Sequence, residues 1–215
     1  MKAEGFRKVG HEQILVDTAA IQAQIDMINE HIPEDGSLRA AMFDITNKRI
    51  ISALVAALDR GVKVYLIIDR NQIQSARTDI RARLDPLQNH VNCIFATAAG
   101  RMAEYAGKMH YKLFYTSKRA LVGGQNWSGA GELYNYDLMV DSSDPAFIRQ
   151  VNDIWTECYR GVTTRGDNTA EGAFGQLLGV LPAPSEMGID TDRASLWDMD
   201  SVRGDPTDTY IKGDT

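Results

Sequence analysis

The sequence predicts a mixed α/β domain, with a largely parallel β-sheet flanked by helices on both faces, followed by an acidic irregular C-terminal tail. Strand, helix and strand patterns follow one another over Ser37–Asp69, as in a βαβ unit. The second of these strands, VKVYLIID, is almost continuously apolar, which is typical of a parallel strand covered on both faces. After Val162, the composition changes to mainly Gly, Asp, Pro, Ser and Thr.

The individual elements follow from apolar periodicity and from turn residues. Isoleucines at helical spacing predict a helix over Glu12–Asn29, and the PEDG turn at Pro33 follows it. The βαβ unit consists of a strand at Ser37–Asp44, a helix at Thr46–Asp59 with Gly61 after its end, and a strand at Val62–Asp69. The later elements are a helix from Ser75 to Leu84, strands at His90–Thr97, His110–Thr116, Arg119–Gly124 and Tyr134–Val140, and a helix that Asp144 caps and Pro145 begins.

Length and charge limit the class of protein. The 215 residues suit one domain, which we place at residues 1–162, with the tail at residues 163–215. The tail carries 4 basic and 10 acidic residues, whereas the body carries 19 of each, so the net charge of −6 belongs to the tail. A neutral body lacks the broad basic field of a strong nonspecific DNA binder. Phosphate contacts must therefore come from local clusters.

Targeting and cysteine patterns favour a cytoplasmic protein without membrane insertion. The first eight residues are polar and charged, with no apolar signal-peptide core behind them, and no apolar run approaches the length of a membrane span. Cys93 and Cys158 lie far apart and form no CxxC motif. This spacing favours reduced thiols over a disulfide or a metal site.

The segment MHYKLFYTSKRALVGGQNWS, Met109–Ser128, carries the side chains best suited to chemistry. Side chains alternate along a strand, so His110 and Lys112 project from the same face. The following strand brings Gly123–Asn126 close to them, where glycines let the backbone approach a ligand and the Asn126 amide can donate hydrogen bonds. An imidazole, an ammonium and an amide that converge on one point suit a tetrahedral phosphate.

His110-x-Lys112 followed by Gly123-Gly124-x-Asn126 resembles the HKD signature of the phospholipase D superfamily. The likeness covers roughly Gln13–Tyr159 and implies the phospholipase D-like fold, with a covalent phosphohistidine on His110 and no metal or other cofactor. It also implies a carboxylate that orients the imidazole, which by position is Asp137, unless Asp137 is a solvated strand residue. The residues expected to contact substrate beside Lys112 and Asn126 are Gly123, Gly124, Gln125, Lys108, Ser128 and Arg70.

Two features depart from the family pattern. Ser117 stands where the signature has its Asp, and the interval from there to the first Gly is one residue shorter. The chain has one motif, because His11, His31 and His90 are not followed by Lys at the second position, whereas family sites combine two motifs. A homodimer would supply the second copy. The alternative is a catalytically inactive binding or structural member of the family.

A short chain with one motif resembles the bacterial endonuclease branch of the family, which implies a nucleic-acid substrate. The alternative is a phospholipase or phosphatidyltransferase acting on lipid phosphodiesters. Basic side chains can follow a phosphate backbone, unless Asp69, Asp79 and Asp85 neutralise part of them on a solvated helix. These basic residues are Arg70, Arg77, Arg81, Arg83, Arg101, Lys108, Lys118 and Arg119. Tyr105, Tyr111 and Trp127 can either stack on bases or pack in the core or in a dimer interface.

The acidic tail permits three interpretations. Its charge can cover the phosphate site, contact a protein partner, or simply keep a disordered tail in solution. The repeated RGDNT, RGDPT and KGDT stretches are typical of turns in a low-complexity tail. Ala173–Leu181 is the tail segment apolar enough to dock on the body.

Overall fold

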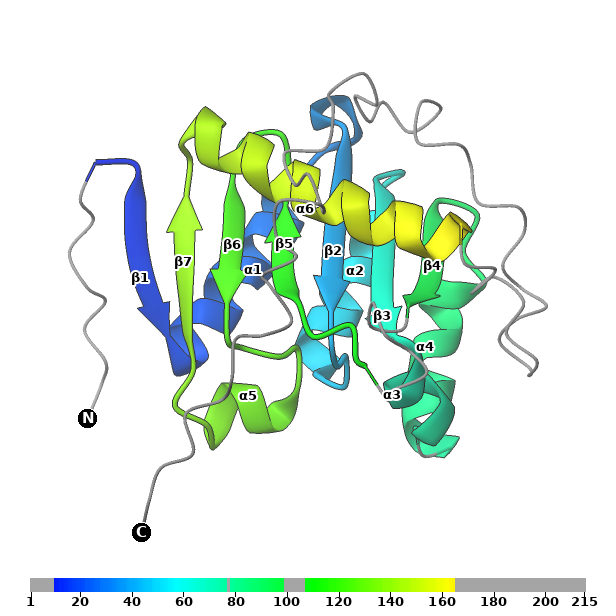
Figure 1. Cartoon of the computed structure of the whole chain (residues 1–215). Coiled ribbons are helices and arrows are strands. Elements are labelled where there is room, and N and C mark those ends of the chain that lie inside the picture. The colour runs from blue at the N-terminus through cyan, green and yellow to red at the C-terminus, as the bar shows by residue number, and fades with distance from the viewer. Residues whose placement is uncertain (1–9, 77, 99–106, 165–215) are drawn as a thin grey trace, which may run out of the picture. The chain divides into compact units, whose positions relative to one another are not determined.

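A computed structural model describes residues 10–76, 78–98 and 107–164, which form a seven-stranded β-sheet with helices on both faces (Figure 1). The strands are β1 (Glu12–Val16), β2 (Ser37–Met42), β3 (Lys63–Asp69), β4 (Cys93–Ala98), β5 (Lys112–Tyr115), β6 (Ala120–Gly123) and β7 (Leu138–Ser142). The helices are α1 (Asp17–Glu30), α2 (Lys48–Asp59), α3 (Arg70–Ser75), α4 (Thr78–Gln88), α5 (Gly129–Leu133) and α6 (Pro145–Thr164), with a 3₁₀ turn at Pro33–Asp35. Helix α6 continues to Thr164, and the predicted tail lies outside the described residues, so the division at residue 162 stays a prediction.

The strand order in the sheet is β1-β7-β6-β5-β2-β3-β4. Strands β2, β3 and β4 pair in parallel, and the other neighbouring strands pair antiparallel. The mixed α/β class and the βαβ unit over Ser37–Asp69 are therefore confirmed. Parallel pairing covers only two of the six neighbouring pairs. It is less extensive than expected because the turn between β5 and β6 is too short for the crossover that a parallel pair needs.

The two faces of the sheet carry different cores. Helices α1, α2 and α4 lie on one face, where Leu54 and Leu58 of α2 belong to a cluster of fully buried aliphatic side chains (Figure 1). Helix α6 crosses the other face over β2, β4, β5 and β6. Its Trp155 stacks on Tyr159 with ring centroids 5.3 Å apart and donates its indole N–H to the carbonyl of Ala40 at 3.0 Å. Cys93 and Cys158, both within the described residues, are not joined in a disulfide.

The predicted helix at Glu12–Asn29 is wrong in its first five residues. Glu12–Val16 form strand β1, which pairs antiparallel with β7, and α1 begins only at Asp17. Asp17 turns the chain with a φ of 47°, which is rare outside glycine. The backbone hydrogen bonds to β7 therefore outweigh the helical spacing of the isoleucines, because sheet pairing of a β-branched segment depends on a distant strand.

Other elements also differ from the prediction, and strands β4 and β5 begin three and two residues later than expected. Ser75 ends α3 instead of capping a helix, because Asp69 caps α3 and α4 begins separately at Thr78. Helix α5 was not predicted; it is five residues long, contains two glycines and begins after the capping hydroxyl of Ser128. Strand β7 begins at Leu138, four residues later than expected.

Strand direction brings several functional segments to one edge of the sheet. Because β5 and β7 run opposite to β2, β3 and β6, the first residues of β5 and β7 lie at the same edge as the last residues of the other three (Figure 1). We call this edge the site edge. In the register of β2 and β5, Met42 pairs with Lys112, so Lys112 lies at the site edge.

The contact between β6 and β7 depends on Gly123. A Cβ atom added there would lie 2.1 Å from the carbonyl oxygen of Leu138 and 2.8 Å from Cα of Met139. We expect Gly123→Ala to lower the free energy of unfolding by about 2 kcal/mol, because backbone atoms cannot move aside without distorting the sheet. Urea unfolding followed by circular dichroism measures this change.

Gly129→Ala is the matched control for that variant. Gly129 is the first residue of α5, and an added Cβ would meet nothing within 4 Å. We expect this substitution to be neutral or slightly stabilising, since it only restricts the unfolded chain. Equal losses of stability in the two variants would contradict the assigned role of Gly123.

Candidate functional site

His110 immediately precedes Tyr111 and β5 at the site edge, and its side chain is exposed. The imidazole lies against Phe43, with ring centroids 4.6 Å apart. Its Nδ1 lies 2.9 Å from Nζ of Lys112, which also donates to the backbone carbonyl of His110 at 2.9 Å. The two side chains therefore lie together at the end of one strand, as strand alternation led us to expect.

Local electrostatics favour the uncharged form of His110. Partial burial lowers the pKa of its imidazole, and the charges of Lys112 and Lys108 lower it further, while Asp69 acts in the opposite direction. The pKa of Lys112 is also lowered, chiefly by burial, and the nearby carboxylate of Asp137 opposes this shift. A neutral imidazole can attack phosphorus or accept a proton.

Asp69 is fully buried at the end of β3 and holds the segment before His110. Its Oδ1 accepts hydrogen bonds from the backbone N–H groups of Asn71 at 3.0 Å and Gln72 at 3.2 Å, which caps α3. Its Oδ2 accepts the N–H of Met109 at 2.8 Å. Asp69 therefore has a structural role inside the domain, and neutralisation of the arginines by Asp69 stays a prediction. The sequence contained a signal for this capping role, because Asp69 stands between an apolar strand and the first residues of a helix.

The loop after β6 carries Asn126 and is held by buried side chains. Gln125 is fully buried, and its Nε2 donates to the carbonyls of Asp17 and Gly131, both at 2.8 Å. Ser128 caps α5 by accepting the N–H of Gly131 at 3.0 Å. These contacts give Gln125 and Ser128 structural roles, and their contacts with substrate stay predictions.

Asp137 precedes β7 and faces the same loop. A Cβ added to Gly124 would lie 3.3 Å from its Oδ1, so the glycine keeps room beside the carboxylate. Within the described part of the chain, Oδ2 of Asp137 and Oδ1 of Asn126 are buried without a hydrogen-bond partner. A buried acceptor without a partner is costly, so these atoms mark positions where a ligand or a second chain can bind.

Only part of the predicted basic cluster lies at the site edge. Nζ of Lys108 is 5.6 Å from the ring centroid of Phe43, which also contacts His110. Arg70 begins α3 directly after Asp69, at the same edge. Arg77, Arg101 and Tyr105 lie outside the described residues.

Other basic residues form ion pairs away from His110. Lys118 pairs with Asp35 at 2.6 Å, and Arg119 pairs with Asp141 at 2.6 Å, both beside the turn between β5 and β6. On α4, Arg83 pairs with Asp79 at 3.0 Å, which favours the alternative of a solvated helix surface there. Arg81 reaches back to the carbonyl of Gln74.

Ser117 lies in the same turn, at the edge opposite His110, where its hydroxyl donates to the carbonyl of Asp35 at 3.0 Å. Seven residues of extended chain separate it from His110 by roughly 20 Å. The departure from the signature at Ser117 therefore leaves the surroundings of His110 unchanged.

Trp127 follows Asn126 but cannot stack on a base, so that alternative is wrong. Its side chain is fully buried and donates its indole N–H to Oε1 of Gln24 at 2.6 Å. The edge-to-face contact with Phe114, with centroids 5.4 Å apart, places it in the core beside α1. Tyr111 is 39% exposed and keeps its ring available at the site edge.

Comparisons with known proteins agree with this architecture. The model of a family described as cardiolipin synthase, phospholipase D-like domain, matches residues 26–158, more than half of the chain. Strand β1 and the first part of α1 precede that match. A comparison with curated protein sequences found no match. Within the described residues, we find no helix with the length and apolar character to cross a membrane, and the cytoplasmic location stays a prediction.

Solved structures show the same fold at low sequence identity. NucT from Helicobacter pylori has a TM-score of 0.62 at 20% identity, over 70% of this chain and 96% of that one. Nuc from Salmonella typhimurium, a phospholipase D family member, has a TM-score of 0.58 at 20% identity, over 70% and 95% of the two chains. TrmBL2, an archaeal chromatin protein described with a novel mode of DNA binding, has a TM-score of 0.50 at 13% identity, over 74% and 55%.

The lowered pKa of His110 gives a direct test of the site electrostatics. We expect its imidazole to titrate below the usual value of 6.5 and to become protonated only at more acidic pH. Lys112→Met should raise this pKa, because the substitution removes the positive charge nearest to the ring. Imidazole chemical shifts followed by NMR across pH 4 to 9 measure the change (a range chosen to bracket about two units on either side of the usual pKa).

Lys118→Met is the control for this titration. It removes a lysine charge at the opposite edge of the sheet, where Lys118 pairs with Asp35. The pKa of His110 should stay at its wild-type value in this variant. An unchanged pKa in Lys112→Met, or an equal rise in both variants, would contradict the proposed contact.

Proposed function

This chain belongs to the phospholipase D-like domain family, and on that premise we propose that it is a metal-independent phosphodiesterase that cleaves nucleic acids. The observation that carries the proposal is the contact of His110 with Lys112 at the site edge, where β6 also ends and the loop of Asn126 begins. The ammonium and the amide can stabilise the phosphate oxygens while the imidazole attacks phosphorus.

The proposed reaction has two balanced steps. In the first, Nε2 of His110 forms a bond to phosphorus as the bond from phosphorus to the leaving oxygen breaks, and that oxygen takes a proton from a second, protonated imidazole. In the second, water attacks phosphorus, the phosphorus–nitrogen bond breaks, and the second imidazole takes the proton of the water. Because one chain carries one motif, a second copy of the chain provides the second His110.

Proton placement on His110 supports a site shared by two chains. Within one chain, Nζ of Lys112 lies 2.9 Å from Nδ1 of His110. A charged ammonium can only donate, and a neutral ring that accepts at Nδ1 carries its proton on Nε2. Attack by Nε2 requires the opposite tautomer, with Nδ1–H held by a carboxylate. Asp137 of a second copy can supply that carboxylate, since its Oδ2 is buried without a partner among the described residues.

The surface around Asp137 also supports pairing with a second copy. Large apolar or aromatic side chains flank the carboxylate and stand in solvent. They are Leu133, 63% exposed, Tyr134, 80%, Tyr136, 103%, and Leu138, 51%. Neighbouring exposed apolar side chains are typical of an interaction surface. A twofold interface there would cover them and bring two site edges together.

Chain length and charge favour nucleic acid over lipid as the substrate. The matched 70% of this chain corresponds to nearly the whole length of the NucT and Nuc chains. Lys108 and Arg70 lie at the site edge, where they can contact neighbouring phosphates of a backbone. TrmBL2, a protein with a related fold, is described as binding DNA.

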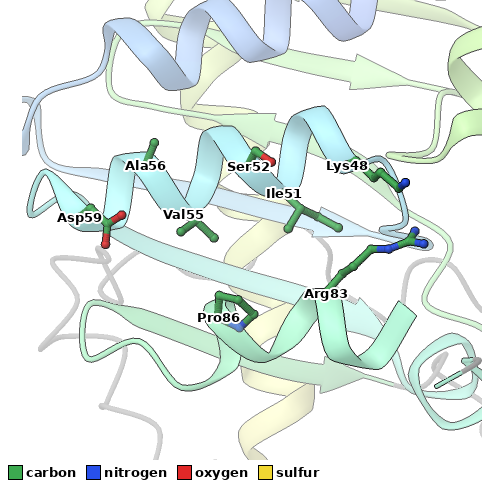
Figure 2. Close-up of a pocket in the computed structure, with 8 residues that line it drawn as sticks. All are labelled: Lys48, Ile51, Ser52, Val55, Ala56, Asp59, Arg83 and Pro86. Atoms are coloured by element: carbon green, nitrogen blue, oxygen red, sulfur yellow. The ribbon is translucent and has the colours of Figure 1, made fainter. Parts of the chain in front are cut away.

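One observation favours a lipid alternative: the matched family is described as cardiolipin synthase. A lipid substrate needs apolar surface beside the phosphate. The apolar groove between α2 and α4 has a volume of about 490 Å³ and is lined mainly by Ile51, Val55, Ala56 and Pro86, with Lys48, Ser52, Asp59 and Arg83 around it (Figure 2). None of these residues belongs to the candidate site, so the groove adds no support for acyl chains at His110.

The proposed nuclease activity predicts metal-independent cleavage. We expect the protein to cleave single- or double-stranded DNA or RNA in the presence of a chelator, and His110→Ala to lose at least about 1,000-fold in rate, because both chemical steps need the imidazole. Gel assays with end-labelled oligonucleotides measure the rate. Ser117→Asp, roughly 20 Å from His110, should keep the wild-type rate. Full cleavage by His110→Ala would contradict the assigned nucleophile.

Vesicles containing phosphatidylglycerol test the lipid alternative. Under conditions that give nucleic-acid cleavage, we expect no release or transfer of phosphatidyl groups, measured by chromatography of the extracted lipids. Lipid turnover that disappears in His110→Ala, without nucleic-acid cleavage, would replace the proposed substrate with a lipid. Absence of both activities in the dimeric protein would favour an inactive binding member of the family.

A further inference from the structure

A second pocket opens at the site edge and has no role in the chemistry described above. Its volume is about 200 Å³. Its hydrogen-bonding lining comes from Asp44 and Thr46, which follow β2, and from Gln72 in α3. Its apolar lining includes Ile73, Ile80 and Leu84. The pocket thus combines polar groups that follow β2 and β3, which we call the polar rim, with apolar walls from α3 and α4.

The backbone of the pocket is connected to the residues that place His110. Asp44 directly follows Phe43, whose ring lies 4.6 Å from the imidazole centroid. On the other side, the N–H of Gln72 donates to Asp69 at 3.2 Å, and the second oxygen of Asp69 holds Met109 at 2.8 Å. Asp44 and Gln72 in the pocket lining are therefore connected, through Phe43 and Asp69, to the segment that carries His110.

The pocket is also tied to the loop of Asn126. Trp127 directly follows Asn126, and its N–H donates to the carbonyl of Asp44 at 3.2 Å. The carbonyl of Trp127 accepts the N–H groups of Thr46 at 2.7 Å and Asn47 at 2.8 Å. The polar rim is thus fixed by a short bridge to the phosphate-binding loop, in addition to its connections with His110.

We propose that this pocket is a base subsite, which holds the nucleobase of a nucleotide adjoining the phosphate at His110. The proposal rests on the proposed nuclease function and deepens it. A volume of about 200 Å³ is smaller than that of sites for drug-sized ligands. It suits one planar ring system, with apolar side chains against the ring faces and polar groups at the ring edge.

The polar groups predict which bases bind best. Asp44 offers a carboxylate, which accepts hydrogen bonds from the exocyclic amino group of a base such as cytosine. Thymine and uracil carry a carbonyl oxygen at the position of this amino group, and a carboxylate aimed at that position repels the oxygen. Burial is the main cause that raises the pKa of Asp44, and hydrogen bonds with the backbone of Ile45 and the side chain of Thr46 act in the opposite direction. Hydrogen bonds at this side chain therefore form in a partly desolvated setting, where they are stronger than in water.

Cleavage-site mapping tests the base subsite. In oligonucleotides that differ only in the base beside one cleavable phosphate, we expect kcat/KM to be about tenfold higher for an amino-bearing base than for thymine or uracil. Asp44→Asn should reduce this ratio to about one, because a side-chain amide both donates and accepts. Ile80→Trp, which fills the pocket, should abolish the preference.

Val55→Trp is the matched control for filling the pocket. Val55 lines the groove between α2 and α4, which shares no lining residue with the base pocket (Figure 2). This variant should keep the wild-type base preference. Thr46→Val provides a smaller change at the rim if Ile80→Trp does not fold, and it should also weaken the preference.

The outcomes separate this inference from the proposed function. Cleavage with a base preference that is unchanged in Asp44→Asn, Thr46→Val and Ile80→Trp would overturn the base subsite and leave the nuclease function standing. If the wild-type protein cleaves no nucleic acid, NMR titration with CMP and UMP decides the question. Tighter binding of CMP, with shifts at Thr46 that are lost in Ile80→Trp, would support the subsite, and no such binding would overturn it.

Discussion

The antiparallel pairing of β5 with β2 is the constraint on which the candidate site depends. In this register Met42 faces Lys112, and the short β5–β6 turn then returns the chain to the same edge at Gly123. Because side chains alternate along a strand, a slip of one residue would turn Lys112 to the face covered by α6, away from Phe43. The buried carboxylate of Asp69 completes the arrangement by fixing the backbone immediately before His110.

A single chain contains the groups for phosphate chemistry, but the imidazole and the carboxylate lack the hydrogen-bond partners that the reaction requires. Nζ of Lys112 lies 2.9 Å from Nδ1 of His110, while Oδ2 of Asp137 is buried without a partner among the described residues. Both features disappear if the carboxylate of each chain meets the imidazole of another, since Nδ1–H then has an acceptor and Nε2 is available for attack. The same contact would cover the aromatic side chains of Tyr134 and Tyr136. Hydrogen bonding and apolar burial thus favour the same twofold contact.

The sequence was most informative where local pattern and tertiary environment agree. The apolar strand before Asp69 and the His110-x-Lys112 pattern depend on spacing that one segment carries by itself, so both were predictable. Strand β1 was not predictable, because its pairing with β7 lies more than a hundred residues away. The roles of Gln125 and Trp127 were also hidden, because whether a polar or aromatic residue is buried depends on neighbours that only the fold brings together. The base pocket combines the ends of two strands with α3 and α4, so no single segment contains it.

The claim that two chains share one phosphate site is tested most directly with a dimer that contains only one functional imidazole. Wild-type and His110→Ala subunits carrying different affinity tags would be co-expressed, and the mixed dimer isolated by sequential purification on both tags. The shared site requires one imidazole as nucleophile and the other as acid, so the mixed dimer should be nearly as inactive as the His110→Ala homodimer. A mixed dimer with about half of the wild-type rate would show that each chain works independently and would contradict the account.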